Sequence, residues 1–148
     1  MTKVILAAVM SFSSLAMACP NLEGSFVYGG KTTIDIVQKQ DEAGITTFEV
    51  TIDDHTCAVC KYDSVLRADG KTVRKDFPVS NSAEITTISC DENRLKFRRS
   101  REFYDETGRV VRTDDENFDY RINRNSDLVK EIIQDETPVY KSVHKRLN

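Results

Sequence analysis

The sequence predicts an all-β protein, built as a single antiparallel up-and-down barrel of about eight to ten strands. Short segments alternate apolar and polar residues, β-branched and aromatic residues fill them, and turn signals recur between them. The clearest segment is 46–53, where Phe48, Val50 and Ile52 share one face and polar residues share the other. No segment shows convincing helical spacing, so almost no helix is expected in the folded domain.

The expected strands follow one another along the chain, separated by turn residues. Segments 25–28 and 32–38 flank Gly29-Gly30, a favoured two-residue hairpin turn. Segments 62–68 and 72–79 flank Asp69-Gly70, the strongest hairpin signal in the chain, and Pro78 marks a strand end or an edge position. The remaining expected strands are 84–90, 94–104, 109–112, 118–122, 128–133 and 139–144.

Residues 1–18 have the features of a secretory signal peptide. Lys3 gives a positive start, 4–15 is an apolar run, and Ala16-Met17-Ala18 is a small-x-small cleavage site. The run is too short to cross a bilayer, and no other stretch is long enough, so no transmembrane segment is expected. The sequence therefore predicts cleavage after Ala18 and a single exported domain, 19–148, in a periplasmic or extracellular location.

Cysteine usage supports an oxidising location. Four cysteines follow the leader, an even number that predicts two disulfides. In a meander, alternate turns lie at the same end, which places Cys19 beside Cys90 and leaves Cys57 to pair with Cys60. A lipid anchor on Cys19 is an alternative, although Ala16-Met17-Ala18 departs from the usual lipidation pattern.

The spacing of Cys57 and Cys60 also allows a different chemistry. A zinc site would need four ligands, and the candidates are His55, Cys57, Cys60 and Cys90. A redox Cys-x-x-Cys would need a helix beginning at the first cysteine, whereas this region has strand and turn patterns. Structural disulfides are therefore favoured, and no metal or cofactor is expected.

Charge and motif content narrow the function classes. The whole chain has a formal net charge of −3, and loss of Lys3 with the leader makes the mature domain more acidic. Nucleic acid is therefore not an expected partner. No catalytic triad order or Gly-rich phosphate loop is present, so an enzyme is not expected, and His144 near the chain end is interpreted as a surface residue.

Arg99 and Arg101 are the candidate ligand-binding residues. Strand alternation places both on the face of Leu95, Phe97 and Phe103, where a guanidinium could bind a carboxylate or phosphate. The other interpretation is favoured, because cross-strand pairs of opposite charge are common: a solvated hairpin end in which acids neutralise the arginines. Those acids are Asp114, Asp115, Glu116 and Asp119.

In outline the strand pattern resembles the lipocalin and fatty-acid-binding (calycin) barrels. Gly24-Ser25-Phe26 lies where lipocalins carry Gly-x-Trp, and Phe118-Asp119-Tyr120 is similar to a later lipocalin motif. The resemblance implies a ligand cavity. The expected function is non-enzymatic binding of a small apolar or amphipathic ligand. The alternative is a solid-cored structural or protein-interaction module with no small-molecule ligand.

Overall fold

The computed structural model describes residues 18–91 and 93–148, and it is an all-β fold with one antiparallel sheet of ten strands. Residues 1–17 of the expected signal peptide lie outside the described residues. Within the described part of the chain, helical structure is limited to the short 3-10 turn η1 (Pro78–Ser80), in agreement with the sequence analysis. The strands are β1 (Gly24–Tyr28), β2 (Thr32–Gln40), β3 (Thr46–Asp54), β4 (Lys61–Arg67), β5 (Thr72–Phe77), β6 (Ser82–Asp91), β7 (Arg94–Tyr104), β8 (Val110–Ile122), β9 (Leu128–Gln134) and β10 (Thr137–Arg146).

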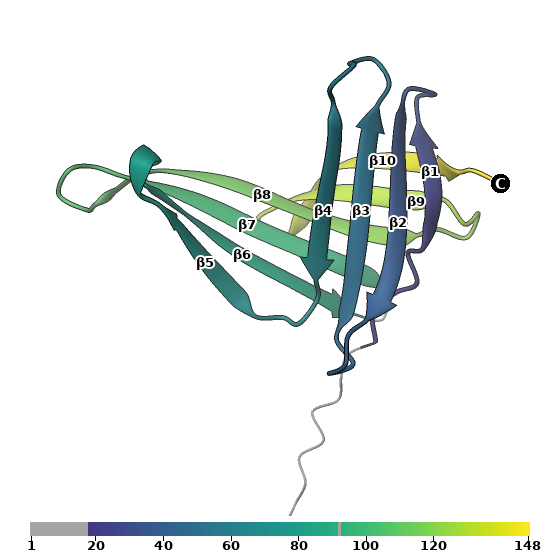
Figure 1. Cartoon of the computed structure of the whole chain (residues 1–148), viewed down its shortest axis with the longest axis horizontal. Helices are drawn as coiled ribbons and strands as arrows, with labels where there is room; N and C mark the ends of the chain where they lie inside the picture. Colours follow the sequence, from purple (N-terminus) through teal and green to yellow (C-terminus); the bar gives the residue numbers. More distant parts are fainter. Residues whose placement is uncertain (1–17, 92) are drawn as a thin grey trace, which may run out of the picture.

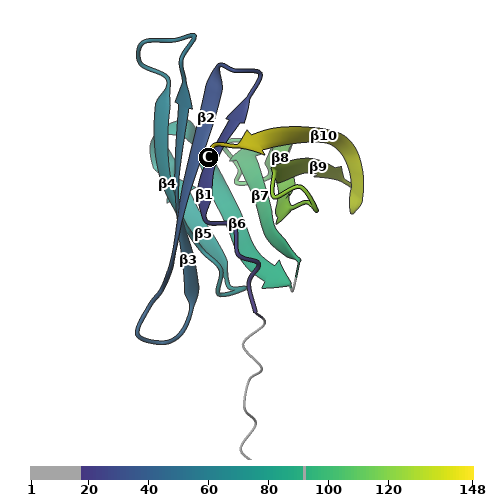
Figure 2. The same cartoon turned by 90° about the vertical axis from the view of Figure 1, so that its right-hand side faces the viewer.

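The strands form a meander whose first and last members pair. The order across the sheet is β4-β3-β2-β1-β10-β9-β8-β7-β6-β5, so β4 and β5 are the two edges although they are consecutive in sequence. In Figure 1, β1–β4 stand upright and β5–β10 lie across them. Figure 2 shows β6–β10 curving around one side of that upright layer.

The sheet is not closed, so the predicted barrel is not confirmed, and the hairpin expected at Asp69-Gly70 does not form. We call the unpaired junction between β4 and β5 the seam. The loop at the seam is held by β6, because the Gly70 N–H donates to the Ile88 carbonyl at 2.9 Å. Arg67 also forms ion pairs with Asp41 and Asp69, which fixes the end of β4 on its own side of the seam.

The core lies between β1–β4 and the base of β6–β9. Strand alternation determines its composition, since Phe48 and Val50 are buried while Glu49 between them is exposed. We call the face of β5–β10 that turns toward β1–β4 the inner face, and the opposite face the outer face. The largest fully buried side chains are Phe26, Phe48, Leu22, Leu95, Leu128 and Val129.

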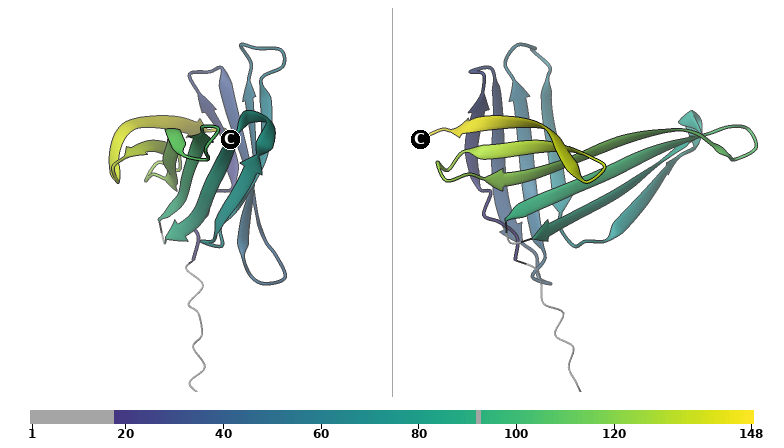
Figure 3. Two further views of the ribbon diagram at one scale, coloured as in Figure 1. Left: turned by 90° about the vertical axis from the view of Figure 1, so that its left-hand side faces the viewer. Right: turned by 180° about the vertical axis from the view of Figure 1, so that it is seen from behind.

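The part of β5–β8 that carries the β5–β6 and β7–β8 turns projects beyond the core, and we call it the arm (Figures 1 and 3). The sequence analysis divided its last strand into 109–112 and 118–122, whereas β8 is one strand of 13 residues. The intervening residues have little strand propensity, but they face opposite charges on β7. Arg99 is the register partner of Glu116, and Arg101 that of Asp114.

Two disulfides join the cysteines in the predicted pairs. Cys19 and Cys90 are 71 residues apart, and their Cα atoms lie 4.9 Å from each other. Cys57 and Cys60 close a tight loop after β3. Both bridges fit an oxidising, exported environment. In the described residues, no helix has the length and apolar character needed to span a membrane.

Candidate functional site

The candidate site begins with the two arginines of β7. Leu95 and Phe97 are buried on the inner face, and the β7 register is regular up to Phe103. Arg99 and Arg101 therefore lie on the inner face, as expected from alternation. The Arg99 guanidinium carbon is 5.7 Å from the centre of the Phe97 ring.

Arg99 is neutralised by acids on both neighbouring strands. It forms ion pairs with Glu116 on β8 and, at 3.6 Å, with Glu84 on β6. The alternative interpretation of the arginine run, cross-strand neutralisation by acids, therefore holds for this residue. Asp114, Asp115 and Asp119 do not contact Arg99 within ion-pair distance.

Arg101 has a different environment. Its guanidinium carbon lies 5.2 Å from the centre of the Phe77 ring and 5.6 Å from that of Phe103. Among the described residues, no carboxylate oxygen lies within the 4.0 Å ion-pair limit of its nitrogens. Within this part of the chain its Nε is buried without a hydrogen-bond partner. Arg101 is thus a half-buried cation between two aromatic rings. Its acidic register partners, Asp114 and Glu84, are ion-paired with Arg112 and Arg99.

A pocket of about 270 Å³ lies at the seam, on the inner face of β5 and β6. Its apolar floor includes Val73 and Ile88, and Ile88 packs against the main core. The pocket is connected to the arginines through Glu84, which is the register partner of both Lys75 and Arg101. The lining residues are Arg67, Asp69, Lys71, Val73, Lys75, Glu84, Thr86 and Ile88.

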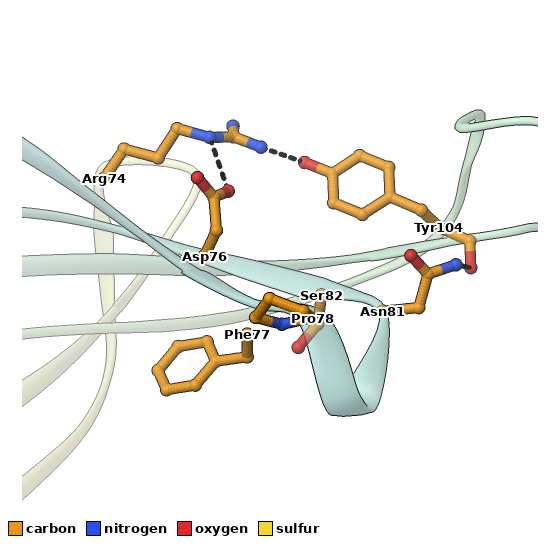
Figure 4. Close-up of a pocket in the computed structure, with 7 residues that line it drawn as sticks. All are labelled: Arg74, Asp76, Phe77, Pro78, Asn81, Ser82 and Tyr104. Atoms are coloured by element: carbon orange, nitrogen blue, oxygen red, sulfur yellow. Dashed lines mark hydrogen bonds and ion pairs between the residues drawn. The ribbon is translucent and has the colours of Figure 1, made fainter.

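A second cavity, of about 300 Å³, lies at the tip of the arm (Figure 4). Arg74 donates to the Tyr104 hydroxyl at 2.7 Å and to Asp76 at 3.0 Å. Asn81, in a left-handed conformation with φ 44°, donates to the Tyr104 carbonyl. These polar groups satisfy one another, and Figure 4 shows Phe77 pointing away from Arg74 and Tyr104. These contacts therefore stabilise the turn at the tip of the arm, and the polar groups described here are already bonded to one another.

The outer face of β7–β9 carries a charged network that the sequence analysis did not identify. Asp119 and Glu131 are only 3% and 7% exposed. Arg94 lies 3.3 Å from Asp119 and 3.0 Å from Glu131. Arg98 holds Asp119 at 2.7 Å, and Arg121 holds Glu131 at 3.0 Å. One feature of the sequence could have indicated this network. Glu131 lies between Val129 and Ile133 on the same strand face, which places a carboxylate in an otherwise apolar row.

The residues of the alternative zinc set do not form a metal site. All three cysteines of the alternative zinc set are in disulfides, and His55 is exposed beside Asp53 at 3.6 Å. In the described ranges 18–91 and 93–148, no group of His, Cys, Asp and Glu is arranged to hold a metal ion.

The prediction that His144 lies at the surface is wrong. It is 6% exposed, because β10 pairs with β9 and β1 and turns this residue to the inner face.

The comparisons with known proteins add no assignment to this geometry. No protein family matches the chain, and no curated protein matches it in sequence.

Proposed function

We propose that the protein is an exported, non-enzymatic binding protein for a small amphipathic ligand that carries an anionic group. The observation that carries the proposal is Arg101, a half-buried inner-face cation with no ion pair among the described residues. A guanidinium in such a place can bind a carboxylate or phosphate through paired N–H donors.

The seam pocket supports the amphipathic part of this proposal. Val73 and Ile88 offer apolar surface for a hydrocarbon group. Lys75 lines the same pocket, and Glu84 lies between Lys75 and Arg101 as the register partner of both. A volume of about 270 Å³ suits a small ligand or one end of a longer one. Such a ligand would lie with its apolar part at the seam and its anionic group toward the arm.

The lipocalin and fatty-acid-binding resemblance is part of the same proposal. What supports it is an up-and-down meander of ten antiparallel strands. Export rests on the features of residues 1–18 and is supported by the two disulfides.

The direct test is calorimetric titration of the mature protein with dodecanoate. We expect Arg101→Gln to weaken binding about ten-fold, the equivalent of one charge-assisted hydrogen bond. Arg124→Gln is the matched control, because Arg124 is exposed in the β8–β9 turn and its loss changes the net charge equally. Dodecyltrimethylammonium, with the same chain and the opposite charge, should bind weakly. Equal binding of the two amphiphiles, or equal loss in both variants, contradicts the proposal.

A second candidate, a solid-cored interaction module, is favoured by the packing between the layers. Phe26, Phe48 and Leu95 are almost completely buried where the layers meet. A core filled by its own side chains needs no ligand. Native mass spectrometry of the protein purified from its own source separates the candidates, since a co-purifying small molecule supports the first and a co-purifying protein the second.

A further inference from the structure

Lys130 on β9 is a second inner-face cation without an acidic partner. Its Nζ lies 4.4 Å from the centre of the Phe118 ring and 5.9 Å from that of Tyr120. Within the described part of the chain it has no ion pair and no side-chain hydrogen bond. The acid that acts on its charge is Glu116, but Glu116 is itself ion-paired with Arg99. The charge of Lys130 is therefore not neutralised by a nearby carboxylate.

Burial makes this ammonium group a stronger anion binder than a surface lysine. Desolvation lowers the pKa of Lys130, which means that little water solvates its charged form. An anion bound beside Lys130 would replace the stabilisation that the ammonium group lost with its water. The low local dielectric would strengthen the attraction between the two charges.

Polar groups of β10 lie beside Lys130 on the same face. Ser142 is its register partner, and the Ser142 hydroxyl lies 3.1 Å from His144 Nε2. Burial lowers the pKa of His144, so the imidazole is neutral at pH 7 and has one donor and one acceptor nitrogen. Among the residues that the structure describes, the other ring nitrogen, Nδ1, is buried with no hydrogen-bond partner. Buried polar groups usually have partners, so an unsatisfied one is unusual.

Two tyrosines complete the surroundings. The Tyr28 ring on β1 lies 5.0 Å from the His144 ring, and the Tyr28 and Tyr140 hydroxyls are 3.4 Å apart. Both tyrosines are exposed, so they lie at the solvent edge of the buried Ser142 and His144. Three strands thus bring together one cation, several hydroxyl groups and a neutral imidazole.

We infer that Lys130, Ser142 and His144, with Tyr28 and Tyr140 beside them, form a binding site for a carboxylate. A single cation matches the single charge of that group, and hydroxyl donors can bind its second oxygen. The inference does not depend on the proposed function, because this site contains neither Arg101 nor any residue of the seam pocket.

The test is an NMR titration of the mature ¹⁵N-labelled protein with butyrate, a carboxylate with a short chain. We expect shifts of the Lys130 and His144 resonances and of the amides of β9 and β10. Lys130→Gln should weaken binding about ten-fold. Lys141→Gln is the matched control, because Lys141 is an exposed residue of the same strand pair on the outer face.

Several outcomes would overturn the inference. These are an absence of shifts at millimolar butyrate, shifts centred on Arg101, or equal weakening by both lysine variants. Stronger binding of inorganic phosphate than of butyrate would assign the site to a different anion and would also contradict the inference. If Lys130→Gln fails to fold, the test uses butyrate binding by Ser142→Ala and the shifts of the His144 resonances in the wild-type protein. Arg101→Gln should leave butyrate binding unchanged, so this site and the proposed function can fail separately.

Discussion

The two faces of β7–β9 carry the same kinds of residue in opposite arrangements. On the outer face, Arg94, Arg98 and Arg121 are ion-paired with two buried acids. On the inner face, Arg99 is also ion-paired, but Arg101 and Lys130 lie over aromatic rings and have no ion pair among the described residues. Since alternate residues point to opposite faces, one strand can hold cations that stabilise the sheet and cations that remain available to a ligand.

The difference follows from what each face must bury. An isolated buried carboxylate is very costly, so Asp119 and Glu131 require the arginines around them. A cation stacked on an aromatic ring keeps much of its charge available, and its methylene groups cover apolar surface. We therefore expect the outer network to contribute to stability, and the proposed binding role falls on the unpaired inner cations.

The largest expected effect is the loss of Asp119. Asp119→Asn removes the buried charge that Arg94 and Arg98 both contact, and these arginines are about a third and a quarter exposed. We expect a loss of about 3 kcal/mol in the free energy of unfolding, at the low end for a broken buried ion pair. Urea denaturation measures it. Asp115→Asn, an exposed residue on the same face of β8, should change stability by less than about 0.5 kcal/mol.

A smaller effect should appear as acid sensitivity at Glu131. Its hydrogen bond with Arg121 lowers the pKa of Glu131 below the ordinary value of 4.5. The resulting stabilisation is complete above that ordinary value and is lost as the pH falls through the lower, folded-state pKa. Glu131→Gln should therefore be less stable at pH 7 and lose less stability below about pH 4.5. Parallel stability curves for the two proteins would show that Glu131 does not contribute in this way.

The smallest effect on stability is expected at Arg101. Because Arg101 has no ion pair among the described residues, Arg101→Gln loses its contacts with the Phe77 and Phe103 rings and a longer-range attraction to Asp114. We expect a destabilisation below about 1 kcal/mol, in the range of an exposed cation–π contact. Thermal unfolding of the variant measures it. A loss as large as that for Asp119→Asn would mean that both faces serve stability, and the comparison between them would fail.

Local patterns were sufficient to predict most strands and the inner-face position of Arg99 and Arg101, and counting the turns of the expected meander predicted the cysteine pairs. Alternation around Phe48 is a property of neighbouring residues, and so is a turn at Gly29-Gly30. The loop at the open seam is instead held by the bond from Gly70 to Ile88, which joins residues distant in sequence. The burial of His144 and the pairing of Glu131 with Arg94 likewise depend on which strands become neighbours. A single sequence does not contain that information in a local pattern.

The seam also determines how the chain can assemble. Most neighbouring strands in the sheet are consecutive in the chain, so their pairing is local and should form early. The pairing of β1 with β10 instead joins residues 26 and 146, and it must close a loop of nearly the whole domain. A circularly permuted chain, opened within residues 68–71 and joined at its natural ends, would have strands in the same order along the chain and across the sheet. Its contact order would be lower, and it should fold faster than the natural chain.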